Sequence, residues 1–297
     1  MSVAMDRRVS VAELRAGTEV EGVFACTRKD RLTSKSGSPY LAVELRDASG
    51  SIAARAFRDA DFLGAQFERG DLVWVAGRVE RFRDELQVEL RAARRAEPGA
   101  VEAAEFLPVA YRDLDELDGF LEHLAREVYD PDLRALLGAF LDDPEFRAEL
   151  RRAPCTRGGH HAYLGGLLEH TVAVATLAHE TCMLHPRLNS DLLVCAALLH
   201  DAGKTREFSL GAEIALSEAG ALVGHLVLGQ GLLVERAGRL PGFPDAKLHA
   251  VAHCLLAHHG AEALPGKRFR SPEALALFRL NALDAGVKGA LEHGLAG

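Results

Sequence analysis

The order of hydrophobic and polar residues changes character part-way along the chain. Between Thr18 and about Arg94, five short segments alternate hydrophobic and polar residues, which predicts β-strands over residues 20–26, 40–46, 51–57, 72–79 and 85–91. Clusters of Gly, Ser, Asp and Pro separate these segments, as is typical of turns. A short helix is expected over residues 59–67. Five strands with a helix between the third and the fourth predict an all-β OB-fold barrel.

From residue 113 onward, hydrophobic residues recur with helical spacing, as in residues 113–124 and 132–141. The longest hydrophobic run, residues 192–199, predicts a buried helix that ends on His200 and Asp201, with Gly203 in the left-handed conformation after it. Prolines and a glycine interrupt both periods near residues 98–108. We therefore expect a multidomain chain: an OB-fold nucleic-acid-binding domain over 1–97, a linker over 98–112, and an all-α helical bundle over 113–297.

Composition places few further restrictions on the chain. Its 297 residues suffice for two domains, and no hydrophobic run approaches the ~20 residues that span a bilayer. The N-terminal residues do not resemble a signal peptide, so we expect a cytoplasmic protein that does not contact membranes. The five cysteines are scattered and odd in number, which favours small core residues over disulfides or a zinc ribbon.

Charge is distributed unevenly between the two parts. Residues 1–98 contain 17 Lys and Arg against 16 Asp and Glu, whereas the remainder contains 18 against 27. A polyanion is attracted to local positive charge. The N-terminal part is therefore better suited to contact a nucleic acid.

Several histidines and aspartates occupy positions where a metal site is expected. An ionisable pair at the end of a buried helix, such as His200-Asp201, is costly unless something neutralises it, and a divalent metal commonly does so. Other candidates lie on core-facing helix positions or at helix ends: His170, His225, His258, His259 and Asp284. Any one of them alone is more often a hydrogen-bonded core residue, but the joint pattern favours a metal site. Nitrogen and carboxylate ligands suit Mn, Fe, Co, Ni, Zn or Mg.

The order of these candidates resembles that of the HD-domain superfamily of metal-dependent phosphohydrolases. The phrase His160-His161-Ala-Tyr-Leu-Gly-Gly-Leu-Leu-Glu-His170-Thr precedes His200-Asp201-Ala-Gly-Lys204, and an OB-type segment precedes both. This combination resembles the OB-fold plus HD-domain 3′-to-5′ exoribonucleases of the YhaM type over nearly the full chain. The resemblance implies an HD-domain helical bundle over residues 113–297 and favours manganese or cobalt as the metal.

The resemblance also implies a two-metal site. His170, His200, Asp201 and Asp284 would hold one divalent ion, while Asp201 would bridge to a second ion held by His225, His258 and His259. His253 and His249 are weaker candidates. In this interpretation Asp201, His200 and Lys204 are catalytic, because a hydroxide between two metals attacks the phosphodiester while Lys204 offsets phosphoryl charge.

Substrate contacts are expected in both domains. His160, His161 and Arg157 are candidates for binding phosphate beside the metals. On the barrel, bases stack on aromatic side chains and arginines meet phosphates, so the candidates are Tyr40, Phe57, Arg81 and Arg83, together with Phe82, Arg55 and Lys35. The alternative places the aromatics in the core and the arginines on plain solvated surface. Phe24 and Trp74 are expected in the core.

The leading hypothesis is a metal-dependent 3′-to-5′ exonuclease that hydrolyses single-stranded RNA, with DNA as an additional candidate, to nucleoside 5′-monophosphates. An HD phosphohydrolase or phosphodiesterase acting on a small or cyclic nucleotide is the main alternative, because a fold does not determine its substrate. A redox enzyme with two irons and a nucleic-acid-binding adaptor with a structural metal are further alternatives. The oligomeric state, including a homo-oligomer, is left open.

Overall fold

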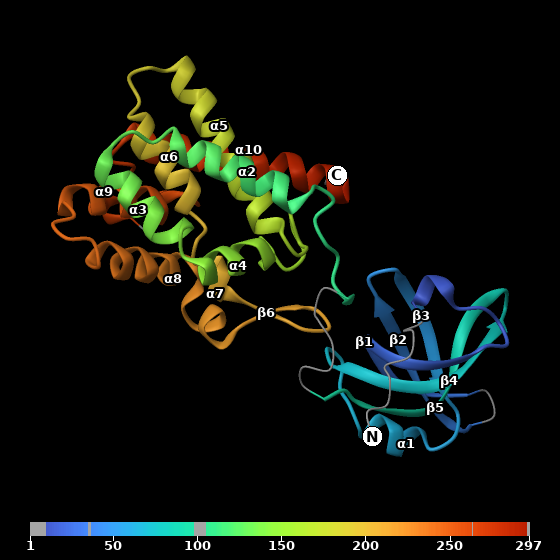
Figure 1. The fold of residues 1–297 in the computed structure, drawn as a ribbon. Coiled ribbons are helices and arrows are strands. Elements are labelled where there is room, and N and C mark those ends of the chain that lie inside the picture. The colour runs from blue at the N-terminus through green and yellow to red at the C-terminus, as the bar shows by residue number, and fades with distance from the viewer. Residues whose placement is uncertain (1–9, 35–36, 98–104, 263, 296–297) are drawn as a thin grey trace. The chain divides into compact units, whose positions relative to one another are not determined.

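The computed structural model describes residues 10–34, 37–97, 105–262 and 264–295. The chain divides into two compact units, residues 1–108 with 210–215 and residues 109–209 with 216–297 (Figure 1). Lys35, residues 1–9 and residues 98–104 of the expected linker lie outside the described residues.

The first unit is a closed barrel with the strand order β1-β2-β3-β5-β4. Its elements are η1 (Val11–Glu13), β1 (Glu19–Thr33), β2 (Pro39–Asp47), β3 (Gly50–Ala56), α1 (Ala60–Gly64), β4 (Leu72–Phe82) and β5 (Glu85–Arg95). β1 pairs antiparallel with both β2 and β4, which closes the barrel, whereas β3 and β5 run parallel. The expected OB-fold barrel is confirmed, with the helix between the third and fourth strands.

Alternation along the strands builds the core of the barrel. In β4, Val73, Val75 and Val79 are fully buried, because alternate side chains point to the same face. Phe24 is buried as expected, but the expectation that Trp74 lies in the core is wrong. Trp74 is half-buried between the inward-pointing valines, and the Arg94 guanidinium lies 4.5 Å from its ring centroid.

β1 continues well past the seven residues expected from periodicity. Its pairing with β2 shifts register between Cys26 and Arg28, where the regular ladder is interrupted. A β-bulge inserts an extra residue and breaks the period of two. The second half of this strand was therefore missing from the pattern of the sequence.

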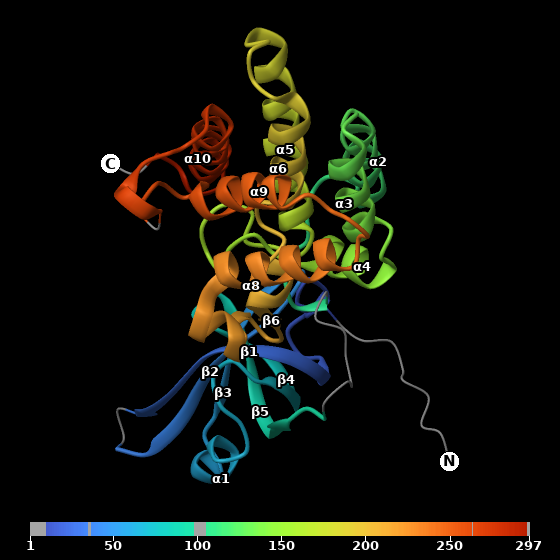
Figure 2. The same ribbon diagram turned by 90° about the vertical axis from the view of Figure 1, so that its left-hand side faces the viewer.

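The second unit is helical. Its elements are α2 (Leu114–Arg126), α3 (Pro131–Leu141), α4 (Pro144–Arg152), α5 (Gly166–Leu184), α6 (Ser190–Leu199), α7 (Lys204–Glu207), α8 (Glu218–Gly238), α9 (Asp245–Ala257), η3 (Pro265–Lys267) and α10 (Pro272–His293). α5 packs against α6 and lies between α2 and α10 (Figure 2). Asp113, Asp130 and Asp143 cap α2, α3 and α4 by accepting backbone N–H groups of the first turn. The expected all-α bundle is confirmed.

Two features of this region differ from the expectation. A short hairpin of β6 (Phe208–Leu210) and β7 (Ile214–Leu216) precedes α8, and strands of three residues are too short to show a period. Gly203 is not left-handed but right-handed, with φ −65°. Glycine is needed there for another reason: a Cβ would lie 2.1 Å from His225 O and 2.4 Å from Gly229 N, so only glycine lets the two backbones meet.

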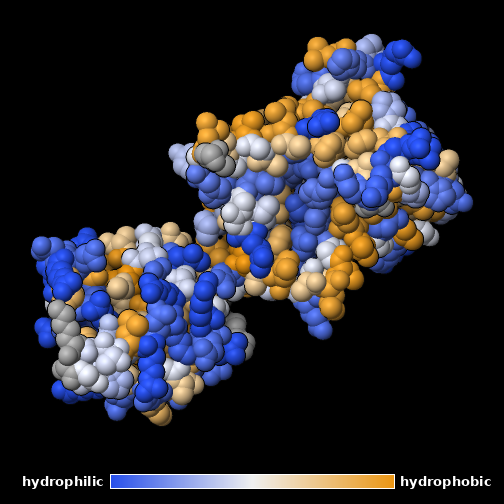
Figure 3. All heavy atoms as spheres, turned by 180° about the vertical axis from the view of Figure 1, so that it is seen from behind, coloured by the Kyte–Doolittle hydropathy of each residue, from blue (hydrophilic) through white to orange (hydrophobic). Residues whose placement is uncertain are grey.

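Two of the described residues of the expected linker are buried. Phe106 and Leu107 are each 1% exposed, and Phe106 packs with Ala25 and Ala212 inside the first unit. None of the helices in the described ranges is long and apolar enough to cross a membrane. On the face displayed in Figure 3, hydrophilic side chains prevail over the barrel.

Candidate functional site

Asp201 lies at the centre of the clustered histidines and uses its two carboxylate oxygens differently. It follows the end of α6 and is 2% exposed. Oδ2 lies 3.5 Å from His170 Nε2 and 3.4 Å from His200 Nε2. Oδ1 instead lies 3.3 Å from His258 Nε2 and 3.6 Å from His225 Nε2. One carboxylate therefore faces a different set of histidines through each oxygen.

Helix ends orient two of these histidines. His200 and His258 are the C-cap residues of α6 and α9, and each places Nδ1 2.7 Å from a carbonyl oxygen one turn back, Ala197 O and Leu255 O. A carbonyl only accepts hydrogen bonds, so Nδ1 of each ring must carry the proton. In the neutral form with the proton on Nδ1, the Nε2 lone pair of each ring points toward Asp201. Burial lowers the pKa of His258, which favours this neutral form.

His170 projects from α5 between the His-Asp pair and α10. Its Nε2 lies 3.2 Å from His200 Nε2 and 3.0 Å from Asn281 Oδ1, while its Nδ1 lies 2.6 Å from Asp284 Oδ2. Asp284 thus contacts His170 through the ring nitrogen that faces away from His200. The ligand atoms of His170, His200 and Asp201 form one group within 4.8 Å, and Asp284 belongs to another with His161 and His170.

His225 and His259 complete the other side of Asp201. Their Nε2 atoms lie 3.0 Å apart, and together with Asp201 and His258 they bring four ligand atoms within 4.8 Å of one another. His253 lies elsewhere, since its Nε2 accepts the Arg270 backbone N–H. The helix α8 is kinked at Gly224, directly before His225, and Leu222 on the other side of the kink is 76% exposed.

The donor set fits a cation. Among the described residues, Asp201 Oδ1 and His258 Nε2 are buried side-chain atoms without a hydrogen-bond partner. Both carry lone pairs and they face each other at 3.3 Å. Buried acceptors that oppose one another are unfavourable unless a positive charge lies between them. Imidazole nitrogens and a carboxylate are common ligands of divalent transition metals.

Lys204 is turned inward beneath Asp201. It is 5% exposed, and its Nζ donates to Asp201 Oδ2 at 2.8 Å and to Cys155 Sγ at 3.4 Å. Burial alone would raise the pKa of Asp201, but the positive charge of the Lys204 ammonium holds it well below its ordinary value. Burial disfavours the Lys204 charge as well, yet Asp201 raises the Lys204 pKa. The geometry therefore suits Lys204 to hold the carboxylate rather than to reach into solvent.

The loop before α5 carries the other predicted contacts of the helical unit. His160 is half-buried with its ring centroid 5.1 Å from that of His170, whereas Arg157 is exposed. His161 is buried, with a left-handed φ of 51°, and Glu292 Oε2 accepts its backbone N–H at 3.0 Å. Burial lowers the pKa of His161 to about 3, so the ring is neutral. His160 and Arg157 are more accessible than His161.

Sequence reasoning missed three side chains at this site: Cys155, Asn281 and Glu207. Cys155 was assigned to the core, but its Sγ lies 3.9 Å from Asp201 Oδ2, and burial raises its pKa to about 12. Asn281 Nδ2 donates to His258 O at 3.1 Å. Cys155 precedes the His160-His161 phrase closely and Asn281 lies one turn before Asp284, and this proximity was the available signal. Glu207 had no signal beyond its position shortly after Lys204.

The barrel gathers most of its predicted contacts on one area. The rings of Tyr40 and Phe57 stack at 5.4 Å between centroids, and the Arg55 guanidinium lies 5.9 Å from the Tyr40 ring and 5.2 Å from the Phe82 ring. Arg83 lies 5.4 Å from the Phe82 ring. Phe57 is 51% and Phe82 45% exposed, so neither is a core residue.

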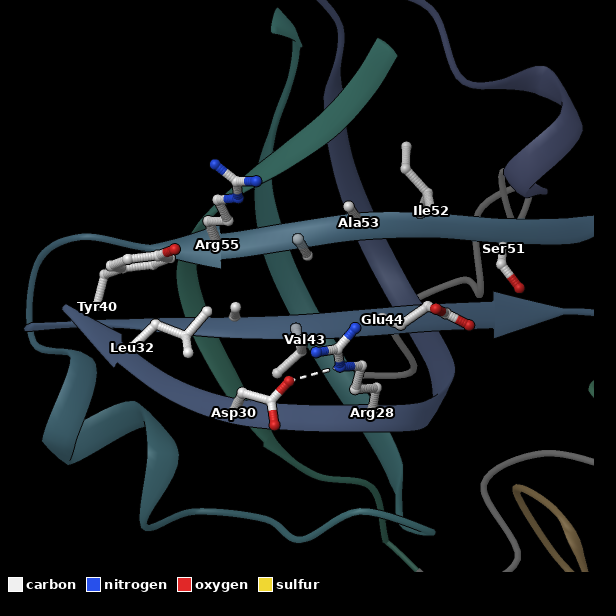
Figure 4. A pocket seen from close by; sticks show the side chains of 12 residues that line it. Arg28, Asp30, Leu32, Tyr40, Val43, Glu44, Ser51, Ile52, Ala53 and Arg55 are labelled. Atoms are coloured by element: carbon white, nitrogen blue, oxygen red, sulfur yellow. Dashed lines mark hydrogen bonds and ion pairs between the residues drawn. The ribbon is translucent and has the colours of Figure 1, made fainter. Parts of the chain in front are cut away.

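A pocket of about 310 Å³ adjoins this area on β1, β2 and β3 (Figure 4). Tyr40 and Arg55 lie side by side at one end of it, and Arg28 pairs with Asp30 along its edge. Arg81 is exposed in β4, but side chains alternate along a strand, which directs it to the face opposite Phe82. Arg81 is thus not brought into the cluster.

Comparison with known families agrees with both units. Residues 23–94 match the profile of the OB-fold nucleic acid binding domain, and residues 167–286 match that of the HD domain. The chain combines an OB-fold domain with an HD domain. Among solved structures, the single-stranded DNA binding protein from Thermus aquaticus matches 28% of this chain and 42% of its own, at 22% identity and a TM-score of 0.25, which supports no further conclusion.

Curated relatives are similar to most of this chain. The 3′-5′ exoribonuclease YhaM of Oceanobacillus iheyensis is 28% identical over 248 residues, covering 82% of this chain and 76% of the relative. The protein of that name from Listeria welshimeri is 26% identical over 288 residues, covering 95% and 90%. That from Geobacillus sp. is 26% identical over 277 residues, covering 93% and 85%. The resemblance to the YhaM-type proteins is confirmed.

Proposed function

We propose that this OB-fold and HD-domain protein is a metal-dependent 3′-to-5′ exonuclease that hydrolyses single-stranded RNA to nucleoside 5′-monophosphates. The observation that carries the proposal is the placement of the Asp201 carboxylate, whose Oδ1 and Oδ2 face separate sets of histidines. In addition, Asp201 Oδ1 and His258 Nε2 have no hydrogen-bond partner among the described residues. A carboxylate of this kind suits two neighbouring divalent cations. The names of the similar full-length proteins supply the polymer and the direction of trimming.

In this proposal His170, His200 and Asp201 hold one cation, and Asp201, His225, His258 and His259 hold the second. When bound, divalent cations lower the pKa of water and offset charge on the phosphoryl group, with manganese or cobalt as the proposed ions. Asp284 approaches His170 from its second ring nitrogen and either orients that ring or joins the first set.

The chain's own residues prepare this site. Lys204 keeps Asp201 ionised and in place through its 2.8 Å ion pair. Ala197 O and Leu255 O hold protons on Nδ1 of His200 and His258, which leaves Nε2 free to act as a ligand. His160 and Arg157, at the accessible side of the loop before α5, are proposed to contact substrate phosphate.

The barrel is proposed to hold the single strand. Exposed aromatic rings offer sequence-tolerant stacking for bases, and each stacked base contributes about 1–3 kcal/mol. Tyr40, Phe57 and Phe82 provide such rings, with Arg55 and Arg83 beside them for phosphates. We propose residues 1–97 as this binding domain, 98–112 as the connection and 113–297 as the hydrolytic domain.

The direct test is a gel assay of the full chain on 5′-labelled single-stranded RNA with added Mn²⁺. Wild-type protein should produce a ladder that shortens from the 3′ end, and a chelator should abolish it. Asp201→Asn preserves the shape of the side chain but removes the charge that both cation sites share, so it should produce no ladder. Circular dichroism before the assay would show whether the variant is folded.

Two outcomes would contradict the proposal. A folded Asp201→Asn protein with full activity would remove the metal centre from the reaction. Intact RNA under every divalent metal, together with hydrolysis of cyclic dinucleotides or nucleoside phosphates, would replace the exonuclease with a small-nucleotide phosphohydrolase.

A further inference from the structure

The Glu207 side chain contacts both the backbone and the imidazole ring of His225. Glu207 is the last residue of α7 and is 8% exposed. Its Oε1 accepts the backbone N–H of His225 at 3.0 Å and lies 3.0 Å from His225 Nδ1. A single carboxylate oxygen therefore contacts two donors of the same residue.

The kink in α8 explains the backbone contact. Gly224 has φ 72° and ψ 166°, so the helix is interrupted and His225 begins a second helical segment that extends to Gly238. The first N–H groups of a helix have no partner within it, and a carboxylate is favourable at that end. Glu207 supplies this cap.

The backbone of Glu207 is itself fixed against the first part of α8. Ser217 N–H donates to Glu207 O at 2.9 Å. A Cβ on Gly220 would lie 2.1 Å from the same carbonyl oxygen, so the two backbones are in direct contact. Glu207 therefore has little freedom to leave His225.

The ring contact determines which nitrogen of His225 is available as a ligand. A carboxylate only accepts hydrogen bonds, so His225 Nδ1 must carry the proton and Nε2 the lone pair. That Nε2 lies 3.6 Å from Asp201 Oδ1 and 3.0 Å from His259 Nε2. Carboxylates that hold metal-binding histidines in this way raise the basicity of the ligand and fix its orientation.

We propose that Glu207 is a positioning residue that holds His225 in the Nδ1–H tautomer and thereby sets the affinity of the cation site of Asp201, His225, His258 and His259. It makes no such contact with His170 or His200, so the other cation site should respond much less. The inference rests on the proposed function only in requiring that the site binds a divalent cation.

The test uses the full chain stripped of metal, as wild type, Glu207→Ala and Glu207→Gln. Glu273→Gln is the matched control: Glu273 is 6% exposed and its Oε1 accepts a backbone N–H from another segment, that of Asn189 at 2.8 Å. Long-range ¹H–¹⁵N correlation on ¹⁵N-histidine protein, with the signal assigned through His225→Gln, reports the tautomer. Electron paramagnetic resonance of free Mn²⁺ during titration reports the affinity of each bound equivalent.

We expect the Nδ1–H tautomer in wild type and its loss in Glu207→Ala. The weaker Mn²⁺ equivalent should bind about 10–100-fold less tightly in that variant, as is typical when an outer carboxylate partner is removed. Glu207→Gln keeps an accepting oxygen without the charge, so it should retain the tautomer and part of the affinity. Glu273→Gln should match wild type in both measurements.

An Nε2–H tautomer in wild type would overturn the inference, and so would unchanged Mn²⁺ binding in Glu207→Ala. If Glu207→Ala fails to fold, Glu207→Gln decides, because a folded variant that binds both Mn²⁺ equivalents as tightly as wild type would refute the role of the charge. Neither measurement uses RNA. A wild-type protein that shows the tautomer and binds Mn²⁺ but does not trim RNA would refute the proposed function alone.

Discussion

Replacing Gly203 with alanine should separate the two halves of the metal centre. Gly203 lies two residues after Asp201, and its backbone meets α8 at His225 and Gly229. A Cβ at Gly203 would lie 2.1 Å from His225 O and 2.4 Å from Gly229 N, whereas ordinary contact begins at 3.4 Å. Both neighbours are backbone atoms that cannot rotate away. The two segments would have to part by more than about 1 Å, a distance over which packing contacts are lost.

The expected magnitudes follow from this displacement. Overpacking of a close contact costs about 1–3 kcal/mol of unfolding free energy. A misplacement of about 1 Å in a catalytic site can lower the rate about 100-fold. Gly203 has right-handed helical angles, with φ −65°, so alanine can adopt this backbone conformation without strain. The close contact alone therefore makes the substitution destabilising.

Urea denaturation and RNA trimming with Mn²⁺ would check both numbers. Gly231→Ala is the matched control, because Gly231 lies in α8, is exposed, and has nothing within 4 Å of a built Cβ. That control should be stabilised by about 0.5–1 kcal/mol, the usual gain of alanine over glycine within a helix, with unchanged trimming. If Gly203→Ala behaved like Gly231→Ala in both assays, the close backbone contact would not exist in solution.

Three further predictions concern other contacts. Lys204→Met leaves the buried Asp201 without its ammonium partner, so metal-free protein should lose about 3–5 kcal/mol of unfolding free energy. Mn²⁺-loaded protein should lose distinctly less, because the bound cation also offsets the charge of Asp201. Equal losses in denaturant titrations of the two forms would show that Lys204 and the cation do not neutralise the same carboxylate. Phe57→Ala should weaken binding of single-stranded RNA by about 1–3 kcal/mol in fluorescence anisotropy without changing stability. Phe62 on α1 is the control: it is 67% exposed against 51% for Phe57, and Phe62→Ala should leave binding unchanged. Equal effects of the two substitutions would place the strand elsewhere. Hydrogen bonding to the Lys247 ammonium lowers the pKa of Asp130. Lys247→Met should therefore be less stable than wild type above about pH 4, and this difference should vanish as the pH falls through the lowered pKa of Asp130. A difference that persists in acid denaturation curves would contradict this.

The sequence alone determined which kinds of element form and which residues are candidates for the chemistry. Alternation with a period of two identifies a barrel strand because neighbouring side chains face opposite sides, so that Val73 and Val75, two residues apart, both point into the core. A histidine such as His170, on the hydrophobic face of a helix, must be buried wherever that helix packs. The domain types and the candidate ligand residues could therefore be predicted from the sequence alone.

Periodicity failed where the backbone departs from a regular element. The bulge after Cys26 interrupts the period of β1, and the kink at Gly224 interrupts the helical period of α8 directly before His225. Gly203 was correctly singled out but for the wrong reason. A glycine in a sequence can mark either a left-handed backbone conformation or a place where another backbone comes close, and only the folded structure distinguishes the two.

The tertiary structure alone decided how the site residues meet. A helical pattern in the sequence shows toward which side of a helix a side chain points. It does not show which residue of another helix lies opposite that side chain. Only the folded structure shows that the two carboxylate oxygens of Asp201 face different histidines. In the same way, only the folded chain shows that Lys204 Nζ meets Cys155 Sγ and that Glu207 meets His225. Contacts between residues far apart in sequence arise from packing, and packing is a property of the folded chain as a whole.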